Sequence, residues 1–159
     1  MGDRPSWPDD LATLRPALDA VLRGSALLGH LGGELVDWGL GWAEVSLPTV
    51  PAFANLAGTV HGGVVAAAAD AAFEAACNSY GRVALAAALS AHYTAPAAVG
   101  TTLTATAGEI GRGRRTASYR IDVLDRDSVR VAWFQALAHR TSRWHLGEER
   151  WPPEWRSCH

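Results

Sequence analysis

The feature that most restricts the fold of this chain is the alanine-rich segment GGVVAAAADAAFEAACNSY, residues 62–80. Its apolar residues have helical spacing, and we expect one helix over most of the segment. A helix with so little polar surface has to be buried against another layer of the protein. Two carboxylates, Asp70 and Glu74, interrupt the segment, so it is not a membrane span. The rest of the chain must therefore supply an apolar surface that covers this helix.

Downstream of Gly81 the period of the apolar residues changes from about 3.6 to 2, which is the period of a strand. The alternation predicts four strands, over residues 83–93, 102–107, 116–123 and 129–140, joined by turn-like segments. Upstream, residues 13–23 have the apolar spacing of a short helix, and residues 42–48 alternate like a half-buried strand. This order predicts an α+β fold in which a long central helix packs against an antiparallel sheet.

Length and composition fit one compact domain. The chain has 159 residues, of which 48% are hydrophobic, and this is enough for one sizeable core. We expect an N-terminal extension with the short helix over residues 1–24 and a main domain over residues 25–141. The remaining residues, 142–159, form a Trp-rich tail that we expect to pack on the surface as an appendage.

Charge and cysteine usage restrict the class of protein. The formal net charge is -2, so we expect neither a nucleic-acid partner nor an anionic membrane surface as a partner. Cys77 and Cys158 do not suggest a disulfide framework, and the residues after Met1 contain no apolar signal-peptide core. The histidines are scattered without metal-ligand spacing. We therefore expect a cytoplasmic protein without a metal site.

Asp70 and the start of the predicted helix carry the candidate chemistry. Burying a carboxylate without partners costs several kcal/mol, so an unpaired Asp70 among alanines indicates a function. His61, Gly62 and Gly63 stand where the helix begins. The N–H groups of a first helical turn have no intrahelical acceptor, and glycines allow a substrate oxygen to approach them. This arrangement is typical of an oxyanion hole.

The spacing of Gly62 and Asp70 indicates a site shared by two chains. These residues are eight positions apart, which corresponds to about 12 Å along a helix axis. An oxyanion donor lies about 3 Å from the reacting carbonyl oxygen, and the attacking atom lies about as close to the carbonyl carbon. Two helices packed antiparallel across a two-fold axis solve this problem, because Gly62 of one chain then faces Asp70 of the other. The sequence therefore predicts a homodimer with two equivalent sites.

The segment NLAGTVHGGVVAAAADAAFEAACNSYG, residues 55–81, resembles the hotdog-fold thioesterases of the PaaI-like type, which is named after phenylacetic acid degradation. The shared pattern is N-x-x-G-x-x-H-G-G, a carboxylate nine residues after the His, and a following A-F…A-C-N-S. The resemblance extends over roughly residues 25–140, through the strand segments to VAWFQALAHR. Single elements of the pattern are common, but their ordered combination is specific.

The resemblance implies a hotdog fold, in which an antiparallel β-sheet wraps around a long central α-helix and the chains form dimers, often dimers of dimers. It also implies hydrolysis of acyl-CoA thioesters. In that reading Asp70 is the catalytic carboxylate, acting as general base or as nucleophile. The Gly62 N–H polarises the thioester carbonyl, Asn55 orients water or substrate, and His61 supports the loop. No cofactor is implied, because coenzyme A is part of the substrate.

The basic turn GRGRRT, residues 111–116, is a solvated turn when taken alone. With the resemblance it becomes the turn that meets the phosphates of coenzyme A. Ala71 and Glu74 depart from the family pattern, and Glu74 stands one turn after Asp70. Glu74 either points to the partner chain or binds a polar acyl group. The residues expected to contact substrate are Gly63, Glu74, Tyr93, Pro96, Arg112, Gly113, Arg114, Arg115, Thr116 and His139.

Three other activities share parts of this pattern. One is a thioesterase that acts on acyl-carrier-protein thioesters in a biosynthetic pathway. A hotdog hydratase or dehydratase would use a His/Asp or His/Glu pair, and its characteristic loops are not found in the sequence. A non-catalytic acyl-CoA binding protein would need an interaction module for which the chain is too short. The sequence favours hydrolysis of a small or aromatic acyl-CoA.

Overall fold

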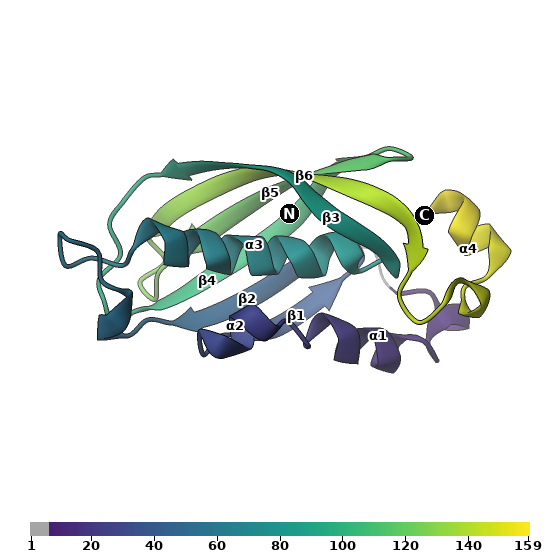
Figure 1. Cartoon of the computed structure of the whole chain (residues 1–159), viewed down its shortest axis with the longest axis horizontal. Coiled ribbons are helices and arrows are strands. Elements are labelled where there is room, and N and C mark those ends of the chain that lie inside the picture. The colour runs from purple at the N-terminus through teal and green to yellow at the C-terminus, as the bar shows by residue number, and fades with distance from the viewer. Residues whose placement is uncertain (1–6) are drawn as a thin grey trace.

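The computed structural model describes residues 7–159, so the first six residues of the expected N-terminal extension lie outside it. A six-stranded antiparallel sheet curves around one long helix, α3 (Figure 1). The strand order across the sheet is β1-β2-β4-β5-β6-β3. The strands are β1 (Glu34–Gly39), β2 (Trp42–Pro48), β3 (Arg82–Tyr93), β4 (Thr102–Arg112), β5 (Thr116–Leu124) and β6 (Arg130–Trp144). The helices are η1 (Asp9–Leu11), α1 (Arg15–Leu22), α2 (Ala26–His30), η2 (Pro51–Phe53), α3 (Gly62–Asn78), η3 (Glu148–Arg150) and α4 (Pro153–Cys158). This arrangement confirms the predicted α+β fold.

The core lies between α3 and the sheet. Small side chains on α3, including Ala68, Ala72 and Ala76, let the strands approach closely, and Phe73 fills the centre. The Phe73 ring meets the edge of the Tyr119 ring at 5.3 Å between centroids. The alternating apolar residues of β2, β4 and β5 point toward this helix and are buried. The predicted change of period therefore corresponds to the boundary between helix and sheet.

The helix α2 was not predicted, and the strand β1 is the second strand before the central helix, which the sequence left open. The glycine-rich passage before β2 contains the short helix α2 and the edge strand β1. The pairing of β1 with β2 shifts register between Leu35 and Asp37, and the shift breaks the alternation of apolar residues along β1. α1 and α2 both contact α3, and they lie along the side of the molecule that carries β1 (Figure 1).

The edge strand β3 exposes apolar side chains. Leu85 and Tyr93 are 58% and 54% exposed, and most other residues of β3 are exposed as well. β6 is the sole strand that pairs with β3 among the described residues, so the opposite edge of β3 offers unpaired backbone groups. An apolar edge strand of this length is a template for pairing with another strand.

One residue of the C-terminal tail, Trp151, is buried in the core, while the other residues of the tail pack on the surface, as the sequence suggested. Trp151 is 1% exposed, and its Nε1 donates a hydrogen bond of 2.7 Å to the carbonyl oxygen of His145. Its ring lies directly over Gly81, where φ is +83° and an added Cβ would meet the Trp151 ring at 2.1 Å. Trp144 and Trp155 pack against the same ring. The tail therefore covers the end of α3 and the start of β3.

Replacing Trp151 by Ala is expected to lower the free energy of unfolding by about 3–5 kcal/mol, the usual cost of removing a fully buried aromatic ring. Chemical denaturation followed by far-UV circular dichroism measures this loss. Trp133→Ala is the matched control, because Trp133 stacks on His92 at a half-exposed position and should cost less. A loss at Trp151 no greater than that of the control would contradict a core role for Trp151.

No helix in residues 7–159 is long and apolar enough to cross a membrane.

Candidate active site

His61 shapes the start of α3. It is the N-cap residue, in an extended conformation with φ −61° and ψ 134°. Its Nδ1 accepts a hydrogen bond of 2.9 Å from the Gly63 N–H, so this donor is already used. The Gly62 N–H, by contrast, has no acceptor within the described part of the chain. The helix start therefore offers one free backbone donor, at the position that the sequence analysis assigned to the oxyanion.

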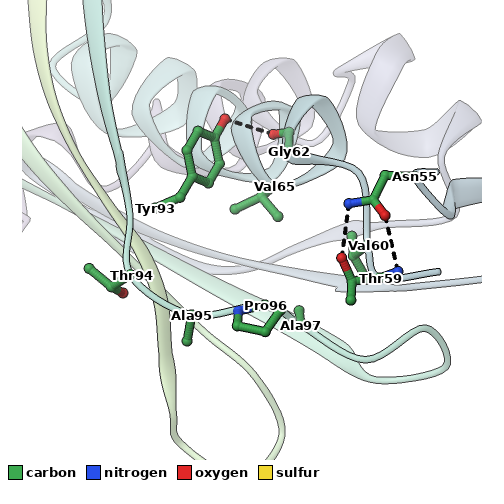
Figure 2. A pocket seen from close by; sticks show the side chains of 10 residues that line it. All are labelled: Asn55, Thr59, Val60, Gly62, Val65, Tyr93, Thr94, Ala95, Pro96 and Ala97. Atoms are coloured by element: carbon green, nitrogen blue, oxygen red, sulfur yellow. Dashed lines mark hydrogen bonds between the residues drawn. The ribbon is translucent and has the colours of Figure 1, made fainter. Parts of the chain in front are cut away.

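Asn55 organises the loop that leads to α3. Its Oδ1 accepts hydrogen bonds from the N–H groups of Ala57 and Thr59, at 2.9 and 3.1 Å, and its Nδ2 donates to Thr59 Oγ1 at 2.9 Å (Figure 2). The side-chain amide is thereby held in one orientation. An amide nitrogen carries two N–H groups, so one of them stays available beside Gly62.

Asn55, Gly62, Tyr93 and Pro96 line one cavity of about 380 Å³, as Figure 2 shows. The Tyr93 hydroxyl donates a hydrogen bond of 2.9 Å to the carbonyl oxygen of Gly62 and so joins the end of β3 to the helix start. The structure thus brings four of the predicted residues together. Thr94 and Ala95 also line the cavity, and they fall within the stretch from Tyr93 to Pro96 that the resemblance pointed to, whereas four lining residues were not predicted: Thr59, Val60, Val65 and Ala97. Of these four, Thr59 and Val60 lie between Asn55 and Gly62, and their position in the chain was the available signal.

Asp70 lines a different hollow, of about 290 Å³, between α3 and α2. Its side chain is exposed in the single chain, which corrects the expectation of a buried carboxylate. The reason is that one face of α3, formed by Gly63, Ala67, Asp70, Ala71 and Glu74, points away from the sheet and is only partly covered. Desolvation by the residues around this hollow, and secondarily the negative charge of Glu74, raise the pKa of Asp70 above its usual range.

Glu74→Gln is expected to move the acid limb of the pH profile of kcat/KM to lower pH. A base works only when ionised, so activity falls as the pH drops through the pKa of Asp70. Removing the neighbouring negative charge lowers that pKa, because ionisation of Asp70 then meets less repulsion. Glu34→Gln makes the same charge change at an exposed position on β1 and should leave the limb in place. An unmoved or upward-shifted limb in Glu74→Gln would contradict the coupling of the two carboxylates.

The arginines of the basic turn between β4 and β5 differ in their contacts and exposure. The Arg112 guanidinium lies 3.9 Å from the centroid of the Tyr80 ring, contacts His159, and lies 3.6 Å from a carboxylate oxygen of Glu109. These contacts hold the Arg112 side chain in place, and it lines a hollow of about 370 Å³ together with Arg114 and Arg140. Arg114 and Arg115 are exposed at the turn.

His139 lies on β6, paired with Leu85 of β3 and Thr116 of β5, and it is exposed. Along β6, His139 is seven residues from Ala132, the partner of Tyr93, which corresponds to about 23 Å. The structure does not bring His139, Thr116 or the basic turn to the cavity of Gly62 within one chain.

No group of three or more His, Cys, Asp or Glu side chains within residues 7–159 is arranged to hold a metal ion.

Comparisons with known proteins agree with this fold. The model of the thioesterase superfamily matches residues 57–132. The acyl-coenzyme A thioesterase PaaI of Escherichia coli (strain K12) is 33% identical over 81% of this chain and 92% of its own length. The solved structure of E. coli PaaI superposes with a TM-score of 0.77, at 31% identity over 80% of this chain and 93% of that one. A mutant of the phenylacetic acid degradation protein PaaI from Thermus thermophilus has a TM-score of 0.69, at 33% identity over 72% of this chain and 98% of that one.

Proposed function

Because the chain belongs to the PaaI-like hotdog-fold thioesterases and is thus a thioester hydrolase, we propose that it hydrolyses acyl-CoA thioesters in sites that two chains share. The observation that carries the proposal is the separation of the two candidate catalytic groups. The free Gly62 N–H and the Asp70 carboxylate belong to two different hollows of the same chain, about 12 Å apart along α3. Neither hollow holds both a donor for the carbonyl oxygen and a base.

A homodimer built on β3 and the open face of α3 supports this proposal. Pairing two copies of β3 antiparallel would cover the exposed apolar side chains of the edge, including Leu85, Leu89 and Tyr93. The same two-fold axis would place the Gly62 end of one α3 opposite the Asp70 turn of the other. It would also bring the basic turn of one chain toward the Tyr93 end of its partner. Each site would then contain a helix start from one chain and a carboxylate from the other.

The proposed reaction uses the groups at the helix start of one chain and the Asp70 carboxylate of the other. The Gly62 N–H and the remaining Asn55 amide N–H stabilise the negative charge that develops on the thioester oxygen. Asp70 acts as the general base: it takes a proton from a water molecule whose oxygen attacks the carbonyl carbon. The raised pKa of Asp70 suits this role, because a more basic carboxylate accepts the proton more readily. When the tetrahedral intermediate collapses, the C–S bond breaks and the proton passes from Asp70 to the departing thiolate.

A thiol-release assay tests the proposed activity. Free coenzyme A is detected by a thiol reagent over a panel of aryl, short-chain and long-chain acyl-CoAs, with an acyl-carrier-protein thioester alongside. We expect turnover of small or aromatic acyl-CoAs and little turnover of the carrier-protein thioester. Absence of thiol release from every acyl-CoA would contradict the proposed function, and a preference for the carrier protein would contradict the proposed substrate class.

Replacing both Arg114 and Arg115 by Ala is expected to raise KM for acyl-CoA by on the order of 3–10-fold, because exposed charge pairs contribute modestly. The corresponding acyl-pantetheine lacks the nucleotide phosphates, so its KM should not change. Arg126→Ala serves as the control, since Arg126 is exposed in the turn between β5 and β6. An equal rise in KM for both substrates would show that the basic turn does not bind the phosphates.

A further inference from the structure

Glu74 separates two neighbouring hollows on the open side of α3. The hollow of Asp70, about 290 Å³, is lined on its other side by residues 24–28 of α2 and the preceding turn. The second hollow, about 180 Å³, continues toward the start of β3 and His145. Glu74 and Ser25 line both. A group that extends from a carbonyl at Asp70 along α3 therefore meets the Glu74 carboxylate one helical turn later, about 6 Å further along the axis.

Ser25 holds this carboxylate in place. The Ser25 hydroxyl donates a hydrogen bond of 2.9 Å to Glu74 Oε2. Glu74 Oε1 accepts no hydrogen bond from residues 7–159, and no arginine or histidine forms an ion pair with it in that part of the chain. One carboxylate oxygen is thus oriented but unused.

The other polar groups of the second hollow do not compete with Glu74 as acceptors for a polar group of the substrate. Asn78 Oδ1 accepts hydrogen bonds from the Ala84 N–H and His145 Nε2, and Asn78 Nδ2 donates to the backbone oxygens of Glu74 and Ala84. Because Oδ1 only accepts, His145 Nε2 carries a hydrogen. Burial lowers the pKa of His145, with a further contribution from Arg143 and a smaller opposing one from Glu74. Glu74 is the one carboxylate among the residues that line the second hollow.

We infer that Glu74, oriented by Ser25, determines acyl-group specificity by selecting thioesters whose acyl group carries an amino group about one helical turn beyond the carbonyl carbon. The inference rests on the proposed function, because it places the reacting carbonyl at Asp70. An ammonium group would form a charge-assisted hydrogen bond with Oε1. A hydrocarbon group of the same size would instead remove the water molecules that hydrogen-bond to the carboxylate, and it would offer no hydrogen bond in their place.

Two acyl-CoAs of matched shape test the inference: 4-(aminomethyl)benzoyl-CoA and 4-ethylbenzoyl-CoA differ at their far end by an ammonium group in place of a methyl group. We expect the wild-type protein to favour the ammonium substrate by about 10-fold or more in kcat/KM, as is typical of a hydrogen bond to a charged group. The ratio is measured well above the acid limb, so that ionisation of Asp70 does not affect it. Glu74→Gln should reduce the ratio to below about threefold, and Ser25→Ala should reduce it in part.

Glu34→Gln is the matched control for charge and should keep the wild-type ratio, because Glu34 is exposed on the edge strand β1. Equal kcat/KM values for the two substrates in the wild-type protein would overturn the inference while leaving the proposed hydrolysis intact. An unchanged ratio in Glu74→Gln would also overturn it. Loss of the dimer in Glu74→Gln, seen by size-exclusion chromatography with light scattering, would assign Glu74 to the interface instead. Absence of thiol release from every acyl-CoA is the separate result that contradicts the function itself.

Discussion

Asp70→Asn is expected to lower kcat for acyl-CoA hydrolysis by about 10²–10⁴-fold, the usual contribution of a general base. The amide has nearly the same shape as the carboxylate but cannot accept the proton of the attacking water. The substitution also removes the repulsion between Asp70 and Glu74, so the fold should be at least as stable as before. The rate is measured as thiol release under saturating acyl-CoA, and the free energy of unfolding is measured in parallel.

Asp127→Asn provides the control for this prediction. Asp127 is exposed in the turn between β5 and β6, and its replacement should leave kcat unchanged. If Asp70→Asn kept kcat within about threefold of the wild-type value, general-base catalysis by Asp70 would be ruled out. A stable variant with normal binding and a greatly reduced kcat is the expected result, because the change affects the transition state more than the bound substrate.

The central helix and five of the strands, β2 to β6, were predictable because the apolar residues of each follow one period. α3 begins at Gly62, where the predicted helix begins, and β3 to β6 lie where the alternation placed them. α2 and β1 were harder to predict from the sequence. α2 is a single short turn, and the bulge in β1 interrupts the alternation of apolar residues along that strand. β4 and β6 extend beyond their predicted ends, to Arg112 and Trp144, through the segments GEIGR and TSRW, which do not continue the apolar alternation.

The exposure of Asp70 could not be predicted from the periodicity of the apolar residues. An apolar helix has to be covered, but the sequence does not say whether the cover comes from the same chain or from another copy. The sheet covers the face of α3 that carries Ala68, Ala72 and Phe73, and the face of Asp70 is left partly open. The exposed apolar residues of β3 belong to the same open side, and together they mark the surface where a second chain is expected.

The candidate site was only partly predictable. The helix start and Asn55 follow from their order in the chain, because the loop between them is short and ends at the helix. The role of Arg112 was not predictable, since its partners Tyr80 and His159 are distant in sequence. The burial of Trp151 was missed for the same reason: Gly81, far upstream, provides the space for its ring.

A shared site predicts that two inactive variants restore activity when they assemble with each other. Gly62→Pro removes the proposed oxyanion donor, because proline has no N–H. The backbone should tolerate the change, since proline is favoured at the first helical position and His61 already has the extended conformation that precedes proline. An added Cβ comes within 3.2 Å of the Tyr93 ring. Gly62→Ala makes that contact too but keeps the N–H, so it serves as the control and should stay active.

The most direct measurement is the activity of a mixed dimer of Asp70→Asn and Gly62→Pro chains, isolated by two different affinity tags. In that dimer one site receives both substitutions, and the other combines the intact Asp70 of one chain with the intact Gly62 of its partner. We predict about half of the wild-type kcat per dimer, although each parent homodimer is nearly inactive. If the mixed dimer forms and is as inactive as its parents, each site lies within one chain, and the proposal of a shared site is wrong.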